Sequence, residues 1–141
     1  MKTEMFLFND KGELFSKAHS MHDCSFTATF HDNTLVLVFD HLEEYYDVSL
    51  DGSNVFWFEN AKKLTIKYYN TEFINLCLKY GKQEKDYYNT VEPLNNKELI
   101  MFGYSADCFG QMTLDFRVFI KKKLWGGKIE IAPEKIEYIW E

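Results

Sequence analysis

Three side chains that could bind a metal or attack a substrate lie close together in the sequence: His22, Cys24 and His41. In the hairpin predicted below, Cys24 lies opposite His41, and His22 projects from the same face of the extended chain as Cys24. Imidazole and thiolate groups that lie this close to each other could bind zinc. They could also form a Cys-His pair in which the histidine keeps the cysteine as a nucleophilic thiolate. The alternative is a small core cysteine between histidines at strand ends. We therefore expect no bound metal and no cofactor, and keep these three residues as metal candidates.

An acidic run with two tyrosines follows: Asp40, Glu43, Glu44, Tyr45, Tyr46 and Asp47. Paired carboxylates could serve glycoside hydrolysis or bind calcium, although their spacing is not that of an EF-hand loop. The plain alternative is a solvated loop. We favour a partner-binding surface, because acids steer a basic protein and tyrosines supply contact area.

One basic block, 121–125, contains three lysines, a leucine and a tryptophan. Such a block could touch a phosphate group or a membrane surface, or could be a solvated turn that joins two strands. The chain lacks the glycine loops, nucleophile elbow and zinc-protease motif that mark common enzyme classes. We expect a protein without enzymatic activity.

Charge narrows the class of partner. The chain of 141 residues has a formal net charge of -6, and its first 60 residues carry 3 lysines against 11 acids. Nucleic-acid binding normally needs a basic stripe, so we expect no nucleic acid as partner. The longest apolar run, 35–39, is far too short to span a bilayer, so we expect no membrane partner. The oligomeric state stays open.

Cysteine usage indicates the compartment. Cys24, Cys77 and Cys108 form an odd set without paired spacing, which does not suit a disulfide framework. The first residues include Glu4 and no long apolar run, which does not suit a signal peptide. We expect three reduced thiols and a cytoplasmic protein.

A period of two dominates the hydrophobic pattern. Residues 25–30 and 34–40 alternate around Asp32-Asn33, a pair that suits a two-residue hairpin turn, and residues 111–120 alternate most regularly. Residues 72–80 fit a strand or a helix, and we favour a strand. The pattern predicts a buried set on these strands: Phe26, Phe30, Leu35, Leu37, Phe39, Leu114, Phe116 and Val118.

The remaining segments complete an all-β pattern. Further strands are expected in 13–17, 45–50, 55–58, 64–69, 98–104, 128–131 and 136–140. We expect one long loop over 81–97 and a turn at Gly126-Gly127. The fold class is therefore all-β, an antiparallel β-sandwich or partly closed β-barrel of about 8–10 short strands. We expect a single domain over 1–141, with 1–20 as a candidate N-terminal hairpin packed on it.

The segment His22-Asp23-Cys24, entering an alternating strand and a short hairpin, resembles small uncharacterised all-β bacterial proteins that open with an H-D-C element. Some of these proteins are similar to immunity proteins encoded beside toxins. The resemblance covers 19–40 and implies a toxin-neutralising or other protein-binding role.

The main hypothesis is therefore a non-enzymatic cytoplasmic protein-binding domain that neutralises a basic partner protein in an immunity-like way. Two alternatives stay open. One is a metal-binding protein or cysteine-dependent enzyme built on His22, Cys24 and His41. The other is a β-barrel that binds a small ligand between its aromatic strands.

Overall fold

The computed structural model describes residues 2–7, 21–45, 61–71, 74–106 and 110–141. Ten strands and two short 3-10 helices make up these segments. They are β1 (Lys2–Leu7), β2 (Ser25–His31), β3 (Thr34–Phe39), η1 (Leu42–Tyr45), β4 (Leu64–Tyr69), β5 (Ile74–Tyr80), β6 (Gln83–Tyr88), η2 (Glu92–Leu94), β7 (Leu99–Ala106), β8 (Met112–Ile120), β9 (Lys123–Ile131) and β10 (Lys135–Trp140). The predicted all-β fold class is confirmed.

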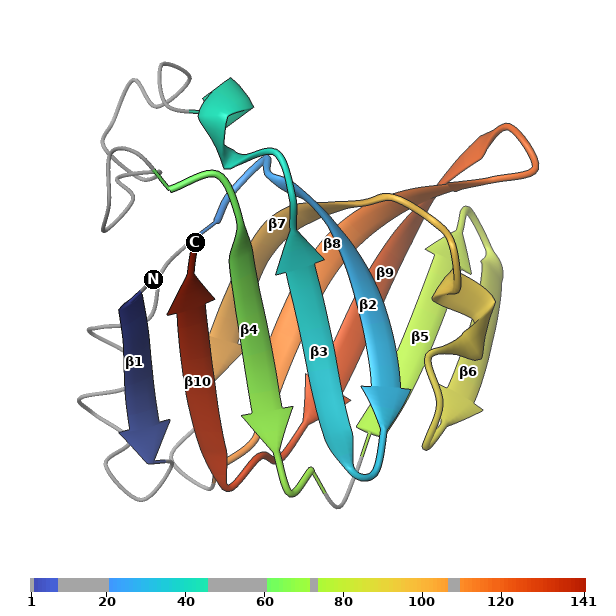
Figure 1. Ribbon diagram of the computed structural model, residues 1–141. Helices are drawn as coiled ribbons and strands as arrows, with labels where there is room; N and C mark the ends of the chain where they lie inside the picture. Colours follow the sequence, from blue (N-terminus) through green and yellow to red (C-terminus); the bar gives the residue numbers. More distant parts are fainter. Residues whose placement is uncertain (1, 8–20, 46–60, 72–73, 107–109) are drawn as a thin grey trace.

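All ten strands belong to one antiparallel sheet in the order β1-β10-β4-β3-β2-β7-β8-β9-β5-β6. The sheet bends at β2, which pairs with β3 over Thr27–His31 and with β7 at Ser25 and Phe26. Figure 1 shows the result: β1, β10, β4, β3 and β2 form one layer, β7, β8 and β9 lie behind it, and the sheet continues beside β2 into β5 and β6. Within the described residues β1 and β6 end the sheet without pairing to each other, so it is not closed into a barrel.

Aromatic rings join the two layers. The Phe26 ring lies 5.1 Å from the Phe39 ring and contacts the Phe116 ring edge-on at 6.3 Å. The buried set predicted from alternation is confirmed except at Phe30, which is only partly buried against the core. Burying side chains on alternate positions of facing strands is the main stabilising contribution in such a fold.

The predicted β2–β3 hairpin has the expected register. Phe30 pairs with Leu35 and Ala28 pairs with Leu37. Asp32 and Asn33 both have positive φ, as a two-residue turn of this kind requires. Residues 74–80 form a strand, as favoured from the sequence.

Two predictions about local structure were wrong. Residues 81–97 are not one loop, because β6 and η2 lie within them. Gly126-Gly127 is not a turn but the middle of β9, and the chain turns instead at Lys121 and Lys122, which both have positive φ. Nearly all residues of β6 are exposed, so the strand shows no apolar alternation in the sequence. A glycine pair in a strand can instead mark a place where a neighbouring ring needs the space.

The N-terminal strand is part of the sheet. β1 pairs with β10 along its whole length, and Trp140 Nε1 donates a hydrogen bond to Glu4 Oε1 at 2.9 Å. The strands expected in 13–17 and 55–58 lie outside the described residues, as does that expected in 45–50 except for Tyr45, which belongs to η1 and not to a strand. Among the described residues, no helix has the length and apolar character needed to cross a membrane.

Candidate functional site

The Cys24 thiol belongs to the core. Its side chain is fully buried, its Sγ lies 3.7 Å from the His22 carbonyl oxygen, and its backbone is hydrogen-bonded to Met101 of β7. Burial, and secondarily the charge of Asp23, raises the pKa of the Cys24 thiol to about 12. The thiol therefore stays protonated at neutral pH and is a poor nucleophile.

The two histidines of the predicted metal set face different neighbours. His22 Nδ1 lies 2.7 Å from the Phe102 carbonyl oxygen, and its ring contacts the Phe102 ring edge-on. His41 is exposed, with Nδ1 4.0 Å from Glu44 Oε1. His22, Cys24 and His41 are all described, and the structure does not bring their donor atoms within reach of one ion.

The predicted acidic surface is partly described. Asp40, Glu43 and Glu44 are exposed at the end of β3 and in η1. Tyr45 belongs to η1, while its side chain and all of Tyr46 and Asp47 lie outside the described residues. In the described part, three of the four predicted carboxylates are therefore exposed in the segment that follows β3.

A surface hollow of about 330 Å³ adjoins these acids. Its lining includes Asp40 and His41 from the end of β3 and Glu98 from the segment before β7. The other lining residues are Ser25, Phe26, Thr27, Val38, Asn96 and Lys97. Asp40 and Glu98 are far apart in the sequence and line the same hollow because β2 pairs with β3 on one side and with β7 on the other. We refer to Asp40, Glu43, Glu44 and Glu98 as the acidic rim.

A larger hollow of about 660 Å³ lies on the outer face of β5, β6, β8 and β9. Its charged lining is mixed: four acids (Glu84, Asp86, Asp115 and Glu130) face three bases (Lys79, Arg117 and Lys128). Neighbouring charges of opposite sign reduce the field in this hollow. The smaller hollow also has one base, Lys97, against two acids, but Glu43 and Glu44 follow it in η1 and add negative charge.

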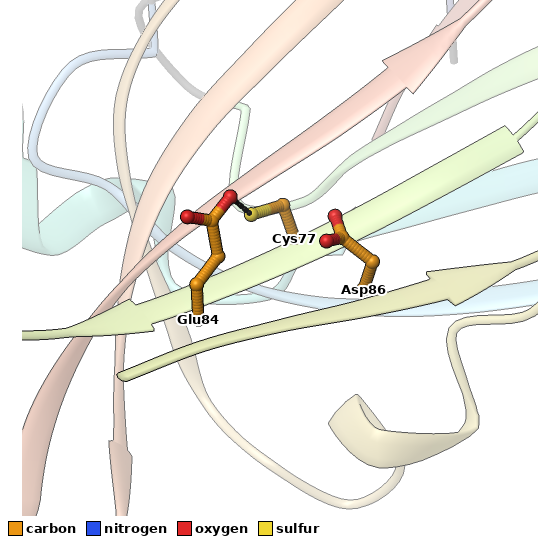
Figure 2. Close-up of side chains that lie close together, drawn as sticks. All are labelled: Cys77, Glu84 and Asp86. Atoms are coloured by element: carbon orange, nitrogen blue, oxygen red, sulfur yellow. Dashed lines mark hydrogen bonds between the residues drawn. The ribbon is translucent and has the colours of Figure 1, made fainter. Parts of the chain in front are cut away.

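Cys77, Glu84 and Asp86 converge at one side of this larger hollow (Figure 2). Their donor atoms lie within 4.8 Å of one another, which makes them the one such group of three among the described residues. The Cys77 thiol donates a hydrogen bond to Glu84 Oε1 at 3.5 Å. Partial burial, the bond to Glu84 and the charge of Asp86 raise the pKa of this thiol to about 11, so a metal would first have to displace its proton.

The sequence did not reveal this group because it depends on the β5–β6 register. Cys77 pairs with Asp86 across the hairpin, and Glu84 lies two residues before Asp86 on the same face. Because 81–97 was predicted as a loop, Glu84 and Asp86 were not assigned to a strand. Gly81, which has positive φ between two tyrosine-containing segments, was the available signal for a hairpin.

Comparison of the chain with models of known protein families, with curated proteins and with solved structures finds no match.

Proposed function

We propose that this chain is a non-enzymatic protein-binding domain that masks a basic partner protein, in the manner of an immunity protein. The contact surface is the acidic rim together with Tyr45, Tyr46 and Asp47, which follow Glu44 in the sequence. The partner binds with a lysine or arginine side chain directed at the hollow beside Asp40 and Glu98.

The observation that carries this proposal is the position of two carboxylates in the lining of one surface hollow, beside the exposed Glu43 and Glu44. Phe26 and Val38 contribute the apolar part of the lining, and its charged part is two carboxylates, Asp40 and Glu98, against one lysine, Lys97. Lysine and arginine have long apolar stems and charged ends, and such a side chain matches a hollow of this kind. Glu43 and Glu44 extend the negative charge beyond the hollow.

The state of the two described thiols argues against the cysteine-dependent alternative. Cys24 and Cys77 are both free, and the pKa of each is raised to about 12 and about 11 respectively. An activated cysteine needs a lowered pKa, which a cationic neighbour or a helix N-terminus supplies. Here the neighbouring carboxylates, Asp23 for Cys24 and Glu84 and Asp86 for Cys77, raise the thiol pKa instead.

A capture experiment with two matched variants tests the proposal. The variant Glu43→Lys/Glu44→Lys changes the acidic rim, and Glu84→Lys/Asp86→Lys changes exposed acids of the larger hollow; each double reversal raises the formal net charge by 4, from -6 to -2. Immobilised wild type and the Glu84/Asp86 variant should retain the same basic protein from extracts of the source cells, and the Glu43/Glu44 variant should lose it. Equal retention by all three proteins would place the interface elsewhere.

A further inference from the structure

Cys77, Glu84 and Asp86 direct three metal-ligating atoms to one point on the outer face of the β5–β6 hairpin. Cys77 pairs with Asp86, and Glu84 lies two residues before Asp86, so all three side chains rise from the same face (Figure 2). Their donor atoms lie within 4.8 Å of one another. The pairing of two strands, rather than a loop, therefore holds the three donors together.

The spacing of the thiol and the Glu84 carboxyl group suits a tetrahedral zinc ion. Cys77 Sγ lies 3.5 Å from Glu84 Oε1. Zinc binds sulfur at about 2.3 Å and carboxylate oxygen at about 2.0–2.2 Å, and a tetrahedral angle between these bonds sets the two ligand atoms about 3.5–3.7 Å apart. A thiolate ligand also favours zinc over calcium and magnesium, which take oxygen ligands.

The thiol proton lies where a cation would bind. Partial burial, and then the hydrogen bonds and charges of Glu84 and Asp86, raise the pKa of the Cys77 thiol to about 11. The carboxylates that hold this proton attract a divalent cation for the same electrostatic reason. Metal binding exchanges one for the other: the S–H bond breaks, a metal–sulfur bond forms, and the proton passes to solvent.

A fourth polar side chain of the same hollow lacks a partner. Asn75 lies two residues before Cys77 on β5 and lines this hollow. Its Oδ1 is the one buried side-chain oxygen or nitrogen among the described residues that has no hydrogen-bond partner. A buried acceptor of this kind is met by water or by a ligand. Water bound to a metal at Cys77 supplies such a donor on the face of β5 to which Asn75 belongs.

The charges around the group fit a divalent ion. The ionised thiol and the two carboxylates carry three negative charges, and a divalent cation neutralises two of them. Lys128 pairs with Cys77 from β9, and Lys79 pairs with Glu84 from β5, so bases flank the group and offset the charge that remains. The other charged residues that line the hollow are Asp115, Arg117 and Glu130.

We propose that Cys77, Glu84 and Asp86 bind one divalent cation of the zinc class, with the Cys77 sulfur as a thiolate ligand. The ion links β5 to β6, which ends the sheet and pairs with no other described strand. The site lies outside the acidic rim and needs no protein partner, so this proposal and the proposed function can fail independently of each other.

A cobalt titration tests the sulfur ligand, because a Co²⁺–thiolate bond absorbs in the near ultraviolet. The variant Cys108→Ser keeps Cys77 and the buried Cys24 as its two thiols. Near neutral pH it should develop this absorption with a dissociation constant below about 0.1 mM, and Zn²⁺ should abolish it. Cys77→Ser in the same background should not absorb. No absorption from Cys108→Ser at about 1 mM Co²⁺, or absorption that persists in Cys77→Ser, would overturn the proposal.

Matched acid variants test the carboxylates. Glu84→Gln/Asp86→Asn removes two negative charges from the group, and Asp115→Asn/Glu130→Gln removes two from the same hollow outside the group. In calorimetric titrations with Zn²⁺, the first variant should bind about 100-fold more weakly than wild type and the second should stay within about threefold. Circular dichroism checks that both variants are folded.

The same titrations test the exchange of proton for metal without any variant. Wild type titrated in two buffers of different ionisation enthalpy should release about one proton for each Zn²⁺ ion bound. Zinc binding without proton release would contradict a thiolate ligand, and equal zinc affinity in the two double variants would contradict the carboxylate ligands. Either result would overturn the proposal.

Discussion

Gly127 lies where the Phe116 ring covers the backbone of β9. The two residues pair across β8 and β9, Phe116 is fully buried, and a Cβ added at Gly127 would collide with the ring carbons. Gly127→Ala should therefore lower the free energy of unfolding by about 1–3 kcal/mol, the usual effect of overpacking. Denaturant unfolding followed by circular dichroism measures the change.

The neighbouring glycine provides the control. A Cβ at Gly126 would lie 3.6 Å from Arg117 Nη1, which is ordinary contact, so Gly126→Ala should change the free energy of unfolding by no more than about 0.5 kcal/mol. Equal losses in the two variants would mean that the ring of Phe116 does not occupy the space above Gly127.

Cys24 should make the protein less stable in alkali. Its pKa rises from 9.0 to about 12 on folding, so above pH 9 the unfolded chain loses a proton that the folded chain keeps. The free energy of unfolding should then fall with rising pH, by about 1.4 kcal/mol per pH unit for this group between pH 9 and 12. Cys24→Ala should reduce that slope, as measured by urea unfolding at several pH values. An unchanged slope would contradict a buried, protonated thiol.

The turn between β8 and β9 has a backbone conformation that does not suit its residues. Lys121 and Lys122 both have positive φ, a conformation that disfavours residues other than glycine, asparagine and aspartate. Lys121→Asn/Lys122→Gly fits the same two-residue turn and should raise the free energy of unfolding by about 1–2 kcal/mol. Thermal unfolding of the variant and of wild type measures the change, and the variant should have the higher melting temperature. An equal or lower melting temperature would contradict the turn geometry.

Elements with one buried face could be predicted from the sequence. Alternation in 25–40 and 111–120 identified β2, β3 and β8, because each strand has its apolar residues on the side that faces the other layer. β6 escaped prediction because nearly all its residues are exposed at the end of the sheet and carry no period. The turn predicted at Gly126-Gly127 was wrong for a different reason. Gly127 is a glycine because the ring of Phe116 occupies the space that a side chain would need, not because the chain turns there.

At the scale of the whole molecule, both hollows depend on strand order. Asp40 and Glu98 line one hollow because β2 lies between β3 and β7, and Cys77 meets Asp86 because β5 pairs with β6. Residue types alone therefore suggested Asp40, Glu43 and Glu44 as contact candidates and left out Glu98. They also placed His22, Cys24 and His41 together, although Cys24 is buried while His41 points to solvent.

The acidic rim predicts how association depends on salt. A cluster of like charges speeds the encounter with a basic protein, and salt screens this effect over a Debye length of about 8 Å at physiological ionic strength. Overall charge is matched in the Glu43/Glu44 and Glu84/Asp86 double reversals, so a difference between them reports the location of the contact.

The most direct measurement is the association rate constant of the captured basic partner with wild type and both variants over a series of salt concentrations. Glu43→Lys/Glu44→Lys should slow association about tenfold at low salt, with the difference shrinking as salt rises, and Glu84→Lys/Asp86→Lys should stay near wild type. Equal rates for the two variants at every salt concentration would contradict binding at the acidic rim.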